Sequence, residues 1–331
     1  MDTAWSQPPL ALLKRYHLGN ELGKGGHGFA LSAVDRLTGQ HCAVKFIYKS
    51  KIPITGWVTL CLQEGSAPAV LDCVHVPMEI YVLQQIQHPN VIKLLNVYQD
   101  DYFYYLVTEA HGINWSSGTH HHYHSPVMPP APADHPPIPT QSPSPPIEIL
   151  PPPPPVLKKE GAHDLFECIE HHGHFSEALS KHVFTQILDA LLHLKSRNIY
   201  HRDIKDENIL IDDHFQVKLI DFGSAVGVQR NKQTWLSQFH GTLSFAAPEI
   251  LKGLLYEPEP AEAWSLGVLL YTMLYGQVPF SNPLQVIHGQ CHTSSIDSSK
   301  SCLHLINSLF RKYPKHRPTL EKIRAHPWLG P

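Results

Sequence analysis

Two patterns of apolar positions follow one another in the first third of the chain. Residues 29–49, FALSAVDRLTGQHCAVKFIYK, alternate small and apolar positions on both sides of the turn LTGQ, which predicts two antiparallel strands joined by a hairpin. Residues 76–95 have the period of a helix, with one apolar face formed by Met78, Val82, Leu83 and Ile86. FYYLVTEA, residues 103–110, is typical of a buried strand. These patterns predict a small sheet with one helix.

Helical periodicity dominates the second half of the chain. Residues 180–198, SKHVFTQILDALLHLKSRN, carry one apolar face formed by Val183, Ile187, Leu188, Leu191 and Leu192. Later segments continue mostly helical patterns to RAHPWL near the C-terminus. The most apolar of them, WSLGVLLYTMLYG from Trp264, is shorter than the ~20 residues of a membrane span, so we expect a buried core helix.

A segment of different composition separates these two regions. Fifteen of the 30 prolines lie between Pro126 and Pro155, after the stretch THHHYH. We interpret residues 113–161 as an insertion, because such a composition favours an extended or disordered chain over a packed core. Its prolines suit polyproline II ligands of SH3- or WW-type domains, although a spacer would serve equally well. For the histidines we favour a solvated polar run over a metal site.

Composition and charge narrow the class of protein. With 331 residues, 42% of them hydrophobic and 17% charged, the chain can form a globular domain of two lobes. A net charge of −3, with the 25 histidines counted as neutral, provides no basic field, so neither nucleic acid nor a membrane is expected as a partner. The six cysteines form no C-x-x-C pair, and the N-terminus shows no secretory signal. We therefore expect reduced thiols and a cytoplasmic or nuclear location.

A glycine-rich stretch, LGKGGHGFA from Leu22 to Ala30, spells G-x-G-x-x-G with Gly23, Gly25 and Gly28. The same spacing opens a dinucleotide-binding unit, covers the phosphates of ATP in protein kinases, or marks an ordinary tight turn. A dinucleotide-binding loop leads into a helix of a parallel β-α-β unit, whereas these glycines precede a predicted hairpin. The flanks therefore argue against a nicotinamide dehydrogenase and favour a loop over ATP.

The run YHRDIKDENILIDDHFQVKLIDFGSA, Tyr200 to Ala225, joins H-R-D-x-K-x-x-N to D-F-G across a short predicted hairpin. With the glycine loop and the strand AVKF before it, this order resembles a eukaryotic Ser/Thr protein kinase from Tyr16 to Leu329, apart from the insertion. The motifs are most similar to those of the PAS-domain kinases and their PIM relatives. The resemblance covers the kinase domain only, without a PAS-like domain.

This resemblance implies an α+β fold of two lobes. After an N-terminal extension, residues 1–15, the kinase domain would occupy residues 16–329. Its small β-rich N-lobe with one main helix would span residues 16–110, and its larger α-rich C-lobe residues 162–329. The insertion would leave and re-enter the fold between them.

The resemblance also implies ATP and Mg²⁺ as cofactors and protein Ser or Thr hydroxyls as acceptors. Lys45 would hold the α- and β-phosphates, and Glu79 would fix this lysine by an ion pair. Asp203 would accept or orient the proton of the substrate hydroxyl, and Lys205 would neutralise the transferring phosphoryl. Lys205, two residues after Asp203, is also the arrangement of Ser/Thr rather than Tyr kinases.

Further residues are assigned to the metal and the nucleotide by the same resemblance. Asn208 and Asp221 would bind the magnesium ions. Thr108 would be a small gatekeeper, and Ala43 and Leu210 would pack above and below adenine. The implied nucleotide contacts, with the backbone of 109–111 at the adenine edge and Asp164 at the ribose, are Leu22, Gly23, Gly25, Gly26, Gly28, Ala30, Ala43, Lys45, Glu109, His111, Asp164 and Leu210.

Several positions depart from the usual kinase pattern. Ala30 stands where most kinases carry Val and His27 replaces an aromatic residue at the loop tip, so we expect modestly weaker nucleotide affinity. Glu262 replaces the common Asp of D-x-W-S-x-G, as in PAS-domain kinases, and is not expected to damage the fold. Glu249 and Arg317 resemble the family's buried ion pair. A nucleotide-binding pseudokinase scaffold is the alternative function, but residues of the competent type fill every catalytic position.

Acidic residues near Asp203 bear on substrate choice. Asp206 and Glu207, together with Asp164 and Glu167, resemble acids that line the substrate groove of PIM-like kinases. Carboxylates there pair with guanidinium groups, so we expect a preference for basic residues, especially Arg, N-terminal to the phosphoacceptor. Capping of helices or exposure to water is the alternative role of these acids.

The segment before A-P-E bears on regulation. Many kinases carry a phosphorylatable residue four positions before the Thr of G-T, where its phosphate pairs with the arginine of H-R-D. Here that Thr is Thr242 and the position is Gln238, although Arg202 is present and Thr234 and Ser237 lie nearby. We therefore expect a loop that is ordered without phosphorylation.

Overall fold

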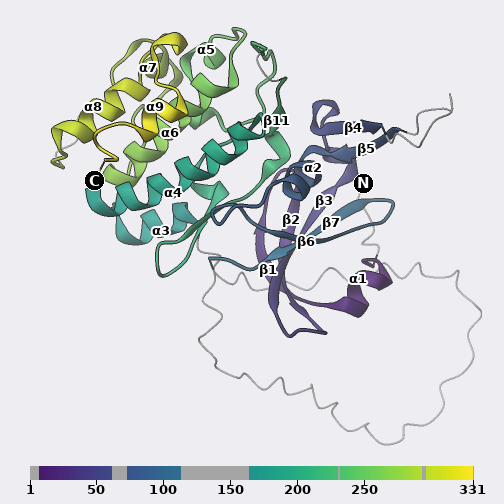
Figure 1. Ribbon diagram of the computed structural model, residues 1–331. Helices are drawn as coiled ribbons and strands as arrows, with labels where there is room; N and C mark the ends of the chain where they lie inside the picture. The colour runs from purple at the N-terminus through teal and green to yellow at the C-terminus, as the bar shows by residue number, and fades with distance from the viewer. Residues whose placement is uncertain (1–6, 62–72, 113–163, 230–231, 293–295, 331) are drawn as a thin grey trace, which may run out of the picture.

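An antiparallel sheet of five strands forms the N-lobe in the computed structural model, which describes residues 7–61, 73–112, 164–229, 232–292 and 296–330. The strand order is β1-β2-β3-β7-β6, with β1 Tyr16–Lys24, β2 Gly28–Asp35, β3 His41–Tyr48, β6 Leu94–Gln99 and β7 Phe103–Glu109 (Figure 1). The antiparallel register from Gly28–Ile47 to Val34–His41 confirms the predicted hairpin. Strand β7 confirms the predicted buried strand.

One apolar cluster of the N-lobe extends beyond the sheet. Phe29 and Phe46 stack with ring centroids 4.4 Å apart, and Tyr105 packs edge-on against Phe46. A short helix that the sequence analysis did not predict, α1 Leu10–Arg15, adds the fully buried Leu12 to this cluster. The segment expected only as an extension therefore contributes to the core of the lobe.

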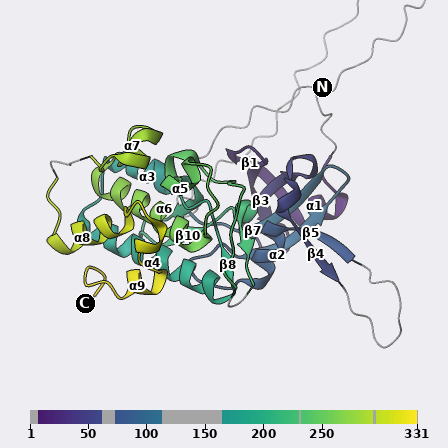
Figure 2. The same cartoon turned by 90° about the horizontal axis from the view of Figure 1, so that it is seen from above.

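Helix α2, Met78–Gln85, confirms the predicted helix of the small lobe. Met78, Val82 and Leu83 are buried, and Ile86, which follows the last helical residue, is buried with them. Before α2 the chain forms elements that were not predicted. They are the 3-10 turns η1 Lys49–Lys51 and η2 Ile54–Gly56, and a hairpin of β4 Trp57–Cys61 and β5 Cys73–Pro77. This hairpin projects away from the sheet in both views (Figures 1 and 2).

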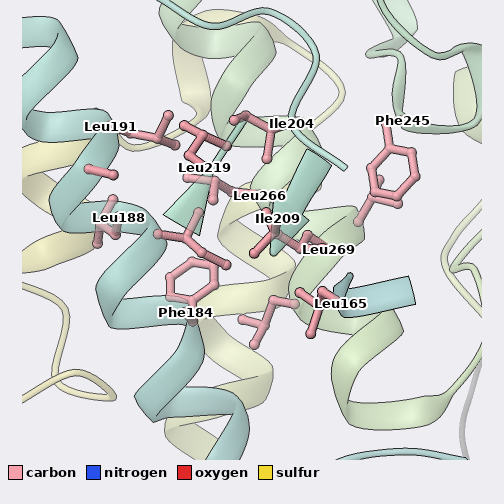
Figure 3. Close-up of a cluster of buried hydrophobic side chains, with 14 of the residues drawn as sticks. Leu165, Phe184, Leu188, Leu191, Ile204, Ile209, Leu219, Phe245, Leu266 and Leu269 are labelled. Carbon is pink, nitrogen blue, oxygen red and sulfur yellow. The ribbon is translucent and has the colours of Figure 1, made fainter. Parts of the chain in front are cut away.

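Helices make up most of the C-lobe, as predicted. They are α3 Leu165–His172, α4 Glu177–Ser196, α5 Pro248–Leu251, α6 Pro258–Tyr275, α7 Pro283–His288, α8 Lys300–Leu309 and α9 Leu320–Arg324. The predicted apolar face of α4 is buried, with Leu192 at its partly buried edge. It packs with residues of α3, α6 and the loop after H-R-D, such as Leu165, Leu266 and Ile204 (Figure 3).

Helix α6 is the predicted core helix: Trp264 is fully buried, as are most residues after it. Within the described part of the chain, no helix has the length and apolar character that crossing a membrane requires.

Short elements at the junction of the lobes carry the H-R-D and D-F-G motifs. The predicted hairpin between the motifs is β9 Ile209–Ile211 with β10 Val217–Leu219, and β8 Ile199–Tyr200 pairs with β11 Val226–Gly227. Further 3-10 turns follow β8 along the chain. They are η3 Asp206–Asn208, η4 Phe222–Ser224, η5 Leu243–Phe245 and η6 Pro314–His316. The insertion predicted at 113–161 lies outside the described residues.

Candidate active site

The glycine loop joins β1 to β2, and its three motif glycines have different roles. A side chain at Gly28 would place its Cβ atom 1.7 Å from the Phe46 carbonyl oxygen of β3, so the close pairing of β2 and β3 requires glycine here. Around Gly23, Gly25 and Gly26 a Cβ atom would meet nothing within 4 Å. The sequence analysis assigned all three motif glycines to phosphate approach, but the packing of the sheet is enough to explain Gly28.

Lys45, Glu79 and Asp221 form a triad that links β3, α2 and the D-F-G motif. Lys45 Nζ lies 2.7 Å and 2.9 Å from the two carboxylate oxygens of Glu79 and 3.0 Å from Asp221 Oδ1. The Glu79 side chain is only 6% exposed, so this is a buried ion pair rather than a solvated helix charge. The ion pair assigned to Lys45 and Glu79 from the sequence is therefore present.

Burial and pairing shift the pKa of each member of this triad. Burial alone would lower the pKa of Lys45, but the carboxylates of Asp221 and Glu79 raise it overall, so the ammonium keeps its charge. Burial raises the pKa of Glu79 against the opposing effect of Lys45. Burial also disfavours ionised Asp221, but Lys45 outweighs it and holds the pKa at about 2. Asp221 is therefore anionic at neutral pH.

Asp203 is oriented by hydrogen bonds from two sides. Thr242 donates its backbone N–H and its hydroxyl to Asp203 Oδ1, at 2.9 Å and 3.0 Å. Asn208 Nδ2 donates to Asp203 Oδ2 at 3.0 Å and to the Asp203 carbonyl at 2.8 Å. From the sequence, Thr242 was only the reference point for counting back to Gln238, and its contact with Asp203 was not predicted. Both carboxylate oxygens of Asp203 are thus held in a defined orientation.

The backbone that carries H-R-D is held from below by Glu262 of α6. Its Oε1 accepts hydrogen bonds from the backbone N–H groups of His201 and, at 2.9 Å, of Arg202. Arg202 has a positive φ of 69°, a strained conformation for a non-glycine residue that such contacts stabilise. Burial raises the pKa of Glu262 to about 7. Glu262 therefore fits the fold, and its role is to anchor the catalytic loop.

Asn208 and Asp221, the two residues assigned to Mg²⁺, suit this ion chemically. Asp221 is anionic, and its side chain is 38% exposed, so its carboxylate can be reached. Because Asn208 Nδ2 is engaged by Asp203, the amide oxygen is the atom that Asn208 can offer a cation. Carboxylate and amide oxygens are the ligands that Mg²⁺ prefers.

Comparison with known proteins agrees with this arrangement. The family model described as protein kinase domain matches residues 16–117 and 156–329. The chain belongs to the protein kinase domain family. It is 32% identical over 95% of its length to the PAS domain-containing serine/threonine-protein kinase of Mus musculus, covering 18% of that protein. It is 28% identical over 93% of its length to the serine/threonine-protein kinase PSK1 of Saccharomyces cerevisiae, covering 19% of it.

A shorter relative matches over most of its own length. The chain is 29% identical to the serine/threonine-protein kinase pim-2 of Danio rerio, across 96% of this chain and 85% of that protein. By contrast, the chain spans less than a quarter of the length of the mouse and yeast relatives. The resemblance to PAS-domain kinases and PIM relatives is confirmed, and in the PAS-domain case the matched part is the kinase domain.

The residues assigned to adenine and ribose lie on both sides of the junction between the lobes. Gly23 pairs with Ala30, and Ala43 of β3 lies opposite the gatekeeper Thr108 of β7. On the C-lobe side, Leu210 of β9 pairs with Asp164. The residues assigned to the two sides of adenine thus come from β1, β2, β3 and β9, and Leu22 is a buried residue near the C-terminal end of β1.

The side chains of the two assigned hinge residues, Glu109 and His111, bond to neighbouring segments of the chain. Glu109 Oε1 lies 2.8 Å from Lys218 Nζ and accepts a hydrogen bond of 2.9 Å from the Lys93 backbone N–H. His111 Nε2 lies 2.9 Å from the Gln216 carbonyl oxygen. These contacts connect Glu109 and His111 to Lys93, which precedes β6, and to the hairpin β9–β10.

The structure sorts the acids that were expected in the substrate groove. Asp206 is buried at the start of η3, where its carboxylate accepts a hydrogen bond from the Glu207 N–H, so Asp206 is not available to a peptide. Asp164 caps α3 by accepting from the Glu167 N–H at 2.8 Å. Glu207, by contrast, is 55% exposed and paired with Lys205. The expectation was therefore wrong for Asp206 and does not extend to the capping oxygen of Asp164.

The activation segment of the kinase domain is tethered by backbone hydrogen bonds. Arg202 donates to the Gln238 carbonyl at 3.2 Å, and the Tyr256 hydroxyl donates to the same oxygen at 3.0 Å. Leu236 and Tyr256 exchange two backbone hydrogen bonds of 2.9 Å and 3.0 Å. The arginine of H-R-D thus contacts the loop at the Gln238 carbonyl group.

Deeper in the C-lobe, Arg317 and Glu249 form the expected buried ion pair. The two guanidinium nitrogens lie 2.7 Å and 2.6 Å from the two carboxylate oxygens, and the Arg317 side chain is fully buried. Carbonyl oxygens of Pro260 and Arg311 accept further hydrogen bonds. The pair joins α5, which ends the activation segment, to the C-terminal helices.

Proposed function

We propose that this protein is a serine/threonine kinase that transfers the γ-phosphoryl group of Mg-ATP to Ser or Thr hydroxyls of protein substrates. The observation that carries the proposal is the convergence of Lys45, Glu79 and Asp221 with the oriented Asp203 and Asn208. Phosphoryl transfer needs positioning and charge neutralisation rather than covalent help, and this set supplies both.

Each of these residues has a separate role in phosphoryl transfer. Lys45, kept cationic by its two carboxylate partners, would hold the α- and β-phosphates. The substrate hydroxyl oxygen attacks the γ-phosphorus, the bond from that phosphorus to the β,γ-bridging oxygen breaks, and the hydroxyl proton passes to Asp203. Thr242 and Asn208 fix the direction in which the Asp203 carboxylate faces that proton. Lys205 would neutralise the transferring phosphoryl group once its ion pair with Glu207 has broken.

Magnesium, when held by Asn208 and Asp221, would neutralise the charge of the phosphate oxygens. Asp221 contributes its ionised carboxylate and Asn208 its amide oxygen. Lys45 and the backbone of Gly223 share Asp221 Oδ1, at 3.0 Å and 3.3 Å, and so orient the carboxylate.

The experiment that tests the proposal compares the parent protein with Lys45→Met and Asp221→Asn in a radiolabelled ATP assay with peptide substrates. Each change should lower turnover by at least ~100-fold, because Lys45→Met removes a cation that would hold the phosphates and Asp221→Asn removes a charged ligand of the magnesium that would neutralise them. The circular dichroism spectra should stay like that of the parent. A parent protein that binds Mg-ATP without any transfer, including autophosphorylation, would instead be the pseudokinase scaffold.

For substrate choice we propose a preference for Arg N-terminal to the phosphoacceptor. The support is Glu207, which is exposed, anionic and already holds a cation, Lys205. Glu167 lies on α3, which packs against the turn that carries Glu207. Paired peptides with Arg or Ala at the N-terminal positions test this preference, and equal kcat/KM for both would refute it.

We also propose that the activation segment is ordered without phosphorylation. The Gln238 carbonyl takes a hydrogen bond from Arg202, and the Leu236–Tyr256 pairing holds the segment to the C-lobe. Protein made in bacteria, treated with phosphatase and shown by mass spectrometry to be unmodified at residues 224–246 should phosphorylate peptides. Activity that vanished on this treatment and returned on modification of Thr234 or Ser237 would refute the proposal.

Three further expectations have the sequence as their support. We propose an SH3- or WW-type partner for the proline-rich insertion, which a pull-down with the isolated peptide 113–161 would test. We propose a cytoplasmic or nuclear location, which fluorescence microscopy of the tagged chain would test. The weak net charge supports neither a nucleic acid nor a membrane as partner.

A further inference from the structure

The short stretch His240–Thr242 is bonded to both loops that carry catalytic carboxylates. On one side, Thr242 donates two hydrogen bonds to Asp203. On the other, the His240 carbonyl accepts a hydrogen bond of 2.8 Å from the hydroxyl of Ser224, three residues after Asp221. Any displacement of this stretch therefore moves the contacts of both Asp203 and the loop of Asp221.

The residue between these contacts, Gly241, has no space for a side chain. A Cβ atom at Gly241 would lie 2.6 Å from the Arg202 carbonyl oxygen and 2.7 Å from the ring of Phe239. The Arg202 backbone and the Phe239 ring therefore leave no room for a side chain at position 241. His240 and Thr242 are thus joined through a single residue that packs against the H-R-D motif.

The side chain of His240 leaves the C-lobe and contacts the N-lobe. Its Nε2 lies 3.0 Å from the hydroxyl oxygen of Thr55, in the turn η2. This turn connects β3, which carries Lys45, to the segment that leads into α2, which carries Glu79. Elsewhere between the lobes, Asn90 and Ile92 donate hydrogen bonds to carbonyl groups of β10. The Thr55–His240 contact therefore links the lobes on the side of the activation segment.

The imidazole is suited to a neutral hydrogen bond. Burial lowers the pKa of His240, with Arg202 and His27 acting in the same direction. The ring is thus uncharged at pH 7.5, and its Nε2 can donate to the Thr55 oxygen or accept from its hydroxyl. Thr55 is exposed, so its hydroxyl has no part in the core of the lobe.

We propose that the hydrogen bond between Thr55 and His240 is an inter-lobe latch that positions Asp203 and Asp221 for phosphoryl transfer. Thr55 and His240 are positioning residues, because they act through Thr242 and Ser224 rather than on the reacting atoms. This inference rests on the proposed kinase activity, and it adds residues outside the catalytic motifs to the machinery.

The test measures kcat and the KM values for ATP and peptide in Thr55→Val, Thr55→Ser and His240→Phe variants and in the Val/Phe double variant. Thr55→Val keeps the shape of the side chain and removes the hydroxyl. We expect it to lower kcat about three- to tenfold, the effect of losing one neutral hydrogen bond, with both KM values within about twofold. Thr55→Ser should restore kcat, and the double variant should be no slower than the slower single variant.

A matched control is available in the neighbouring hairpin. Thr59 Oγ1 lies 3.1 Å from His75 Nδ1, so it makes the same kind of hydrogen bond, but within β4–β5. Thr59→Val should leave kcat unchanged. Hydrogen exchange supplies a second readout: Thr55→Val should speed exchange in peptides that cover residues 239–245, and Thr59→Val should not.

The outcomes separate this inference from the proposed function. An inactive parent protein refutes the kinase activity and the latch with it. An active parent with kcat unchanged in Thr55→Val overturns the latch alone. Equal losses in Thr55→Val and Thr59→Val, or a loss expressed only in the KM for ATP, also overturn it, because general weakening of the N-lobe or of nucleotide binding would then explain the data.

Discussion

Glu262 makes the stability of the kinase domain depend on pH in a way that one substitution should remove. Its carboxyl group is 3% exposed, and burial raises its pKa from the ordinary 4.5 to about 7. The folded protein therefore holds this proton over a pH range in which the unfolded chain has already lost it. Stability from this group is fully present below pH 4.5 and is lost as pH rises through 7.

The size of the effect follows from the two pKa values. A tenfold change in proton affinity corresponds to about 1.4 kcal/mol, so full ionisation costs the folded state about 3 kcal/mol. Between pH 5.5 and pH 8 the loss is about 2 kcal/mol. Glu262→Gln keeps an oxygen that can accept from the His201 and Arg202 amides but has no proton to lose in this range.

The assay compares melting temperatures of the parent and Glu262→Gln at pH 5.5 and pH 8. The variant should gain on the parent by about 4 °C or more between the two values, since about 2 kcal/mol corresponds to at least this shift for a domain of this size. Glu170→Gln, an exposed position on α3, controls for the loss of one carboxylate. A difference between parent and Glu262→Gln that stays constant with pH would refute the reasoning.

Three other substitutions test the packing, and one replacement tests whether the insertion is needed for turnover. Gly28→Ala should unfold or strongly destabilise the N-lobe because its Cβ would collide with the Phe46 carbonyl, whereas Gly23→Ala should leave the melting temperature within about 1 °C. Glu249→Ala should cost about 3–5 kcal/mol of unfolding free energy, measured in urea, because the fully buried Arg317 loses its partner. Replacement of residues 113–161 by a Gly/Ser linker should leave peptide turnover within about threefold, and a collapse of turnover with intact circular dichroism would contradict this.

Local periodicity was enough to predict the elements that have a regular apolar face, and the two-lobed arrangement came from the resemblance to protein kinases. The β2–β3 hairpin, α2 and α4 each carry a regular apolar face, and the structure buries those faces. Helix α1 and the hairpin β4–β5 were missed for a physical reason. Helix α1 has six residues, too few to be stable alone, and forms because Leu12 finds a place in the core of the N-lobe. Such elements are set by tertiary contacts that no local pattern reveals.

The residues of the site also fall into those that the sequence could predict and those that depend on the three-dimensional path of the chain. The resemblance to protein kinases, carried by the motifs, was sufficient to group Lys45, Glu79 and Asp221, which the structure brings together. It could not distinguish Asp206 from Glu207, which are neighbours in the chain. The turn η3 buries the first and exposes the second, and only the three-dimensional path of that turn makes the difference.

If Glu207 recognises a substrate Arg, as proposed, that Arg and Lys205 compete for the same carboxylate. The pair is partly exposed and so worth at most about 1 kcal/mol, whereas a bidentate Arg–carboxylate contact is about twice as strong as a neutral hydrogen bond. Under the proposed preference, a substrate Arg would displace Lys205 from Glu207 and release this lysine toward the phosphoryl group.

Glu207→Gln should consequently lower kcat/KM for an Arg-containing peptide about tenfold and change it less than twofold for the Ala-substituted peptide, because only the first uses the carboxylate. Glu170→Gln again serves as the control. If Glu207→Gln lowered both values equally, the carboxylate would act through Lys205 or the fold of η3, and Glu207 would not be the group that recognises arginine.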